Sequence, residues 1–151
     1  MTIELGKSVL ALTGEVLPER DLVGGKAWSI ARMRHLGLPV PPAFTITTEA
    51  CHAYLSAGQL DEQLVSDIQS GIEWLAEQTR RQFNGDQSPL LVSVRSGAPI
   101  SMPGMMDTVL NLGITDSTEE ALARESGNPR FAKDTHRRFL ELFRLSCTRP
   151  H

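Results

Sequence analysis

One stretch of this chain restricts its possible folds more than any other. Residues 90–94 form the apolar run Leu-Leu-Val-Ser-Val, which begins after Ser88-Pro89 and ends at Arg95. Such a run is typical of a buried strand, because its side chains pack well on a pleated sheet. A segment rich in glycine, proline and methionine follows and ends the strand. The pattern therefore predicts a sheet in which a buried strand delivers Arg95 to a turn.

Arg95 is a candidate anion-binding residue. A guanidinium presents a planar fork of donors that matches two phosphate oxygens, although a single carboxylate neighbour would explain an arginine there equally well. The segment 101–108 contains three of the five methionines in the chain. Methionine is adaptable packing material, so composition alone favours a loop folded onto the core. The alternative is a flap over a bound anion, which Pro103 and Gly104 would allow to open and close.

The composition is that of an ordinary globular protein. The chain has 151 residues, of which 22% are charged, and a net charge of -3. It lacks the basic excess that favours binding to nucleic acid or to an anionic membrane, so we expect neither partner. Charged residues interrupt the first twenty positions, and neither a signal peptide nor a spanning helix fits, so we expect the cytoplasm. Cys51 and Cys147 lack the spacing of metal ligands, and we expect free thiols and no metal site.

A second candidate anion site lies at Gly24-Gly25-Lys26. Apolar residues recur with helical spacing from Lys26 to Leu36, and Gly37 provides the expected left-handed stop. Glycines at a helix start let a phosphate approach the backbone N–H groups, and a lysine adds a point charge. The triplet alone is a weak signal, because most such triplets are turns with solvated lysines. Its spacing is not that of a Walker loop.

The remaining residues alternate between strand and helix patterns, which predicts the α/β (or α+β) class. Strands are expected at 6–12, 44–47 and 109–112. Helices are expected at 48–56, from about 60 to before 84, from a capping box formed by Ser117 and Glu120 through Glu125, and from Asn128-Pro129 onward. The buried face of the last helix should comprise Phe131, Thr135, Phe139, Leu142 and Phe143.

The order of these motifs resembles the amino-terminal part of pyruvate phosphate dikinase. In that family a strand ending in Val-Arg-Ser-Gly is followed by Ser-Met-Pro-Gly-Met-Met-Asp-Thr and then by Asn-Leu-Gly. These motifs stand here at 94–97, 101–108 and 111–113. Gly24-Gly25-Lys26 and the proline-rich segment leading to 44–48 also match, so the resemblance runs from about Leu22 to about Phe143.

The resemblance implies the front subdomain of an ATP-grasp fold, with a small mixed sheet and flanking helices. The parent enzyme converts ATP, phosphate and pyruvate into AMP, pyrophosphate and phosphoenolpyruvate. This region is expected to bind ATP, with magnesium ligands outside this chain and no catalytic residue within it. The implied ATP-binding residues are Lys26, Arg95, Gly24 and Gly25. The implied flap residues are Ser101, Met102, Gly104, Met105, Asp107 and Thr108.

We expect residues 1–143 to be a partial ATP-binding domain and residues 144–151 to be a divergent tail, where the resemblance fails. A frameshift or an early stop would produce this pattern. Ala27-Trp28 also departs from the Gly-Ala pair usual in the family, and could crowd the backbone near the phosphates. Two functions remain open. The chain is either the ATP-binding front of a dikinase, inactive without the other dikinase domains, or a non-catalytic remnant that binds nucleotide or protein.

Overall fold

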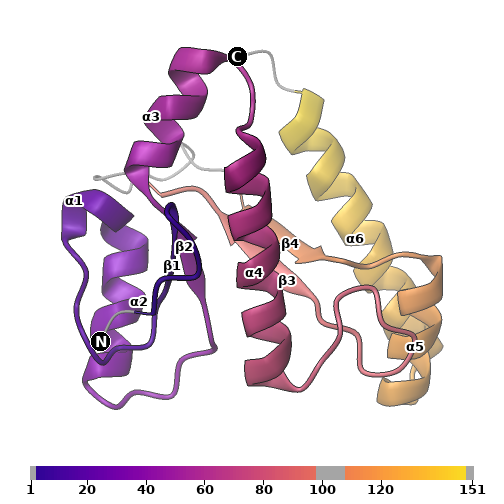
Figure 1. Ribbon diagram of the computed structural model, residues 1–151. Coiled ribbons are helices and arrows are strands. Elements are labelled where there is room, and N and C mark those ends of the chain that lie inside the picture. The colour runs from indigo at the N-terminus through magenta and orange to yellow at the C-terminus, as the bar shows by residue number, and fades with distance from the viewer. Residues whose placement is uncertain (1–2, 98–107, 149–151) are drawn as a thin grey trace. The chain divides into compact units, whose positions relative to one another are not determined.

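The computed structural model describes residues 3–97 and 108–148, which divide into two compact units (Figure 1). Residues 3–78 together with Gly97 form the first unit, and residues 79–96 and 108–148 form the second. The predicted mixed class is confirmed, because the described residues form six helices and four short strands. None of the helices in these two ranges is both long and apolar enough to cross a membrane.

In the first unit, helices surround one short antiparallel pair of strands. Strand β1 (Val9–Ala11) pairs with β2 (Phe44–Ile46), and Val9 lies opposite Ile46. The core of this unit contains Val9, Ala50 and Leu64, with Leu5, Phe44 and Ile68 packed against them. The helices of this unit are α1 (Arg20–Val23), α2 (Gly25–His35), α3 (Thr48–Ala57) and α4 (Glu62–Thr79), whose last residue belongs to the second unit.

Local sequence signals determine where these helices begin and end. The chain leaves α2 through Gly37, whose φ of 79° is the left-handed conformation that the sequence predicted. Helix α3 begins after Thr47, whose hydroxyl accepts a hydrogen bond from the Ala50 N–H at 3.4 Å, and ends at the left-handed Gly58. The predicted positions of α2 and α3 are thus confirmed to within two residues.

Asp67 is a buried polar residue of the first unit that the sequence patterns did not indicate. Its side chain accepts hydrogen bonds from the Ser8 N–H at 3.1 Å and from the Gln63 Nε2 at 2.8 Å. A Cβ on Gly6 would clash with the Asp67 carboxylate, so the turn before β1 needs glycine where it crosses α4. Asp67 therefore connects α4 to the start of the ladder.

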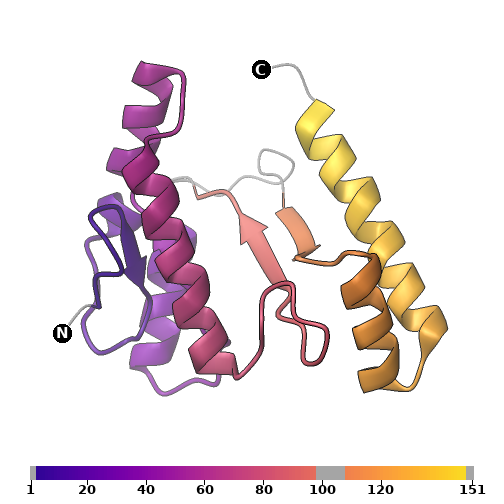
Figure 2. The ribbon, with the colours of Figure 1, turned by 45° about the vertical axis from the view of Figure 1, so that its right-hand side comes forward.

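The second unit contains the other antiparallel ladder. Strand β3 (Val92–Arg95) pairs with β4 (Thr108–Leu112), and a bulge lies where Asn111 adopts a φ of 59°. Helices α5 (Asp116–Ser126) and α6 (Pro129–Thr148) pack against each other, and α6 also contacts β4 (Figure 2). In place of one mixed sheet, the described strands form two antiparallel pairs, because each short pair is completed within its own unit.

The predicted burial of the strand before Arg95 is wrong beyond its first residue. Leu90 is buried, but Val94 is 48% exposed and Arg95 is also exposed. Among the described residues β3 pairs with one strand only, so its other edge has no backbone partner. The apolar pattern correctly predicted a strand but overestimated how much of it the chain covers.

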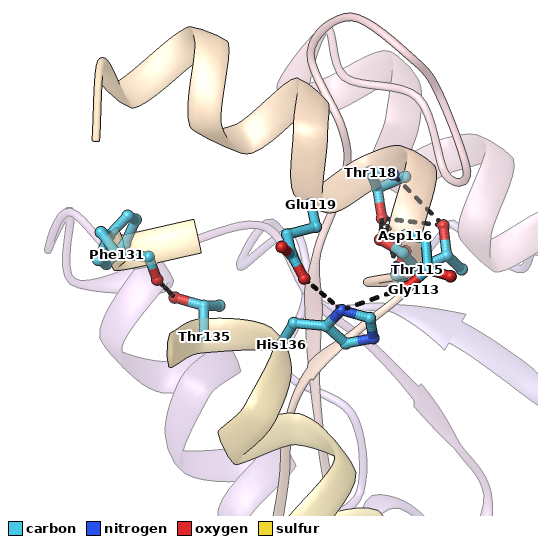
Figure 3. A network of polar contacts seen from close by, with 8 residues as sticks. All are labelled: Gly113, Thr115, Asp116, Thr118, Glu119, Phe131, Thr135 and His136. Atoms are coloured by element: carbon cyan, nitrogen blue, oxygen red, sulfur yellow. Dashed lines mark hydrogen bonds and ion pairs between the residues drawn. The ribbon is translucent and has the colours of Figure 1, made fainter. Parts of the chain in front are cut away.

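The start of α5 also differs from the prediction. The helix begins at Asp116, and its cap consists of Thr115 and Thr118, so the predicted box of Ser117 and Glu120 is wrong (Figure 3). The Thr118 hydroxyl accepts from the Thr115 N–H at 2.6 Å and donates to the Gly113 carbonyl at 3.1 Å. The Thr118 hydroxyl forms hydrogen bonds with two backbone groups of the turn that precedes the helix. This explains why the helix starts earlier than a serine–glutamate motif suggests.

The last helix begins as predicted, because the Asn128 side chain accepts a hydrogen bond from the Phe131 N–H at 3.1 Å. Thr135 and Phe139 are buried as expected, and so is Ala132, which the prediction missed. Phe131 and Phe143 are 50% and 44% exposed, so their predicted burial is wrong. Phe131 lies in the first turn, and the last turns of α6 extend beyond α5 (Figure 2), which leaves both rings at the edges of the packed segment.

His136 of α6 connects the two helices of the second unit. Its Nδ1 lies 2.6 Å from Glu119 Oε2 on α5 (Figure 3). The imidazole is mostly covered, since its side chain is 14% exposed. This contact gives the histidine a structural role within the helix pair.

We predict that the Thr118 hydroxyl contributes measurably to stability. Thr118→Val keeps the side-chain volume but leaves the Thr115 N–H and the Gly113 carbonyl without this partner. The free energy of unfolding in urea should fall by about 1–2 kcal/mol. The control is Ser117→Ala, at an exposed position in the same turn, which should change stability little. A larger loss from Ser117→Ala than from Thr118→Val would contradict this cap.

The ion pair between Arg81 and Glu125 leads to a second prediction, which concerns how stability depends on pH. The guanidinium donates to both carboxylate oxygens, at 3.1 and 2.7 Å, and this hydrogen bonding lowers the Glu125 pKa below its ordinary 4.5. A lowered pKa stabilises the fold above pH 4.5, and that stabilisation is lost as pH falls through the folded value. Since both side chains are well exposed, Glu125→Gln should cost at most about 1 kcal/mol at neutral pH.

The measurement is urea denaturation of wild type and Glu125→Gln at pH 7 and near pH 2. The stability difference should be present at neutral pH and absent in acid. Glu120→Gln, on the same helix and exposed, is the matched control for loss of one negative charge. An equal difference at both pH values would show that the ion pair is not its cause.

Candidate functional site

The junction between α1 and α2 is made by the single residue Gly24. Its N–H donates to the Arg20 carbonyl at 2.8 Å, and its own carbonyl accepts from the Trp28 N–H at 3.0 Å. Gly24 has φ 82° and ψ 162°, a conformation that is essentially restricted to glycine. The residue is also buried. A side chain at this position would therefore displace the start of α2.

The first turn of α2 presents backbone donors. The N–H groups of Gly25, Lys26 and Ala27 have no acceptor among the described residues, and no side chain caps this end. These free donors coincide with the positive end of the helix dipole, and α2 is 11 residues long. Such an end can accept an anion whose oxygens reach the backbone.

Lys26 adds a positive charge beside these donors. Its side chain is half-buried and forms no ion pair with any carboxylate in the part of the chain that the structure describes. The predicted grouping of Gly24, Gly25 and Lys26 at a helix start is therefore confirmed as geometry. Their role in binding remains a prediction.

Arg95 occupies the last position of β3, opposite Thr108 at the start of β4. Residues directly opposite in an antiparallel ladder direct their side chains to the same face. Within residues 3–97 and 108–148, the Arg95 guanidinium has no hydrogen-bonding or ion-pair partner. The described residues thus contain no carboxylate that would explain Arg95 as a structural ion pair.

The predicted flap lies mostly outside the described residues. This holds for Ser101, Met102, Gly104, Met105 and Asp107, whereas Thr108 is the half-buried first residue of β4. Lys26 belongs to the first unit and Arg95 to the second, and each is described within its own unit.

Other features of the described residues do not form a comparable site. They contain no group of three or more His, Cys, Asp or Glu side chains arranged to hold a metal ion. Cys51 is an exposed free thiol. A shallow groove of about 530 Å³ follows α6, but its Arg137 is already paired with Asp134 at 2.7 Å and with Glu141 at 2.6 Å. The start of α2 is the better candidate, because its donors and its lysine are unpaired there.

Comparison with known proteins identifies relatives of this chain. Residues 20–81 match the family described as "Pyruvate phosphate dikinase, AMP/ATP-binding domain". That match includes Gly24, Gly25 and Lys26 but ends before Arg95.

Full-length dikinases extend the similarity. The pyruvate, phosphate dikinase of Clostridium symbiosum is 50% identical over 125 residues, which is 82% of this chain and 14% of that protein. The Rhizobium meliloti enzyme is 49% identical over 126 residues, covering 83% of this chain and 14% of the enzyme. The chloroplastic enzyme 1 of Oryza sativa subsp. japonica is 50% identical over 125 residues, or 82% of this chain and 13% of the enzyme.

The chain thus spans about 14% of the length of the curated relatives that it matches. Its mixed α/β architecture is consistent with an ATP-grasp-type domain. The family match and an identity near 50% over more than four fifths of the chain lead to one assignment. This chain belongs to the pyruvate phosphate dikinase family and is homologous to its amino-terminal ATP-binding region.

Proposed function

We propose that this chain binds ATP as the amino-terminal portion of a pyruvate phosphate dikinase. The observation that carries the proposal is the open start of α2, where three unpaired N–H groups and Lys26 lie within the residues that match an AMP/ATP-binding domain. The parent reaction would convert ATP, phosphate and pyruvate into AMP, pyrophosphate and phosphoenolpyruvate.

Each proposed ligand residue has a distinct task. Gly24 and Gly25 let phosphate oxygens approach the backbone, and Lys26 adds a mobile point charge. The Arg95 guanidinium would donate two parallel hydrogen bonds to phosphate oxygens. Phosphoryl transfer depends mainly on holding the phosphates in position and neutralising their charge, which these groups would begin to do.

The flap residues Ser101, Met102, Gly104, Met105, Asp107 and Thr108 are proposed to cover the bound phosphates. The sequence supports this part of the proposal, since the proposed anion-binding arginine is followed by a segment that contains Pro103 and Gly104, residues common in flexible turns.

Magnesium bound with ATP would neutralise charge on the phosphates. As the resemblance to the dikinases implies, its protein ligands are proposed to lie outside this chain. The partners would then be ATP and the remaining dikinase domains, if those are encoded separately, and the location would be the cytoplasm. Residues 1–143 would form the partial domain, with 144–151 as a divergent tail, although α6 itself continues to Thr148.

Our third prediction concerns the two cationic side chains. Lys26→Met and Arg95→Met should each weaken ATP binding by about ten- to a hundredfold, as expected for loss of a charge-assisted hydrogen bond. Isothermal titration calorimetry gives the dissociation constant, and thermal unfolding gives the melting temperature. Since neither charge is paired among the described residues, the melting temperature should barely change.

Matched controls separate this effect from a general loss of positive charge. Lys133→Met and Arg130→Met remove the same charges from exposed positions on α6 and should leave ATP affinity nearly unchanged. A large fall in stability for Arg95→Met, with ATP affinity unaltered, would make Arg95 a structural residue and reject its proposed role.

Our fourth prediction is that the purified chain makes no phosphoenolpyruvate from ATP, phosphate and pyruvate. Phosphoryl transfer needs metal ligands and an acceptor group that the proposal places outside this chain. A coupled assay for phosphoenolpyruvate, with magnesium present, should therefore remain at background. Sustained magnesium-dependent turnover that copurifies with the 151-residue species would contradict the prediction.

The alternative function is a non-catalytic remnant that binds nucleotide or protein. The coupled assay does not distinguish this alternative, but the binding measurement does in part. Loss of ATP affinity in Lys26→Met and Arg95→Met supports nucleotide recognition, whereas wild-type protein that does not bind ATP would favour a protein partner.

A further inference from the structure

Trp28 makes two cation–π contacts next to the proposed phosphate-binding turn. The Arg20 guanidinium carbon lies 5.6 Å from the centroid of the indole, and that of Arg32 lies 5.3 Å from it. Both distances are within the range of a favourable attraction between a cation and an aromatic ring. Neither arginine has an ion-pair partner within the described part of the chain, so the indole is the contact that orients them.

The contact with Arg20 connects two helices across one residue. Arg20 begins α1, Trp28 lies in the first half of α2, and Gly24 is the cap that the two helices share. The Arg20 carbonyl accepts from the Gly24 N–H, and the Trp28 N–H donates to the Gly24 carbonyl. Arg20 and Trp28 therefore lie on either side of the turn, are hydrogen-bonded to Gly24 through their backbones, and contact each other through their side chains.

Helix α1 is too short to hold this geometry alone. It has four residues, and its attachments within the described residues include the buried Val23 and a hydrogen bond at 2.8 Å from the Thr48 hydroxyl to the Asp21 carbonyl. Helices shorter than about twelve residues gain little from their own hydrogen bonds. The contact between Arg20 and Trp28 therefore adds a side-chain link between α1 and α2.

The direction of Trp28 leaves the proposed site open. Two positions along an α-helix correspond to a rotation of roughly 200°, so Trp28 and Lys26 project from opposite sides of α2. Arg32 is four positions after Trp28 and lies on the same side of the helix. An indole on this side does not obstruct an anion at Lys26.

We propose that Trp28 is a positioning residue for ATP binding. With Arg20 and Arg32 stacked on its ring, it holds α1 against α2 and keeps Gly24 in the conformation that directs the N–H groups of Gly25 to Ala27 at the phosphates. This inference rests on the proposed function and assigns Trp28 no contact with ATP.

The test compares Trp28→Leu, which is apolar but lacks a ring face, with Trp28→Phe, which retains one. Trp28→Leu should weaken ATP binding about two- to fivefold, the factor that corresponds to an exposed cation–π contact, and Trp28→Phe should recover most of the loss. Without ATP, amide hydrogen exchange at positions 24 and 28, whose N–H groups are hydrogen-bonded within the turn, should be faster in Trp28→Leu. A lower melting temperature with unchanged ATP affinity and unchanged exchange at these amides would overturn the proposal.

A double-mutant cycle separates positioning from direct contact. Arg20→Gln should weaken ATP binding in the wild-type background. It should have no further effect in Trp28→Leu, because both changes break the same contact between Arg20 and Trp28. Fully additive effects would mean that Arg20 contacts the phosphates directly. They would reject the positioning role of Trp28. Trp28→Phe and Arg20→Gln keep the test decisive if Trp28→Leu fails to fold.

Lys26→Met, measured in parallel, distinguishes failure of this inference from failure of the proposed function. If Lys26→Met leaves ATP affinity unchanged, the proposed phosphate site is wrong. If Lys26→Met weakens binding while Trp28→Leu does not, only the positioning role of Trp28 is wrong.

Discussion

The first unit depends on a backbone conformation that only glycine adopts comfortably. Gly24 ends one helix and starts the next, and its φ of 82° makes that change of direction possible in a single residue. As at any α-helix start, the first three N–H groups of α2 have no acceptor within the helix, and nothing in the described part of the chain caps them. The glycine conformation that joins α1 to α2 thus lies directly before the proposed anion site.

The second unit depends on a different contact, made by polar side chains. Thr118 is buried, and its hydroxyl connects the start of α5 to the residue that follows β4. His136 then connects α5 to α6 through Glu119. These contacts hold the helices that pack beside β4, and β4 in turn pairs with the strand that carries Arg95. The support of Arg95 is therefore indirect, through a ladder with one partner strand.

The elements that the sequence predicted well are those with local causes. Gly37, Gly58 and Thr47 mark helix ends through their own backbone preferences or hydroxyl groups, so their neighbours hardly matter. Long-range contacts explain what the sequence could not predict. The buried Asp67 accepts a hydrogen bond from the N–H of Ser8, which is 59 positions away in the chain. Phe143 is exposed because nothing described covers the end of α6. The donors at α2 were predictable from two glycines and a lysine, whereas the contact between Arg20 and Trp28 required the turn at Gly24.

The open start of α2 is proposed to receive the phosphates of ATP. The most direct test is a titration of ¹⁵N-labelled protein with ATP, followed through the amide resonances of Gly25, Lys26 and Ala27. We expect these three signals to shift together and to saturate with one dissociation constant, because the phosphate oxygens would accept hydrogen bonds from these N–H groups. If ATP leaves these resonances unmoved and instead shifts those of the groove along α6, ATP does not bind at the start of α2.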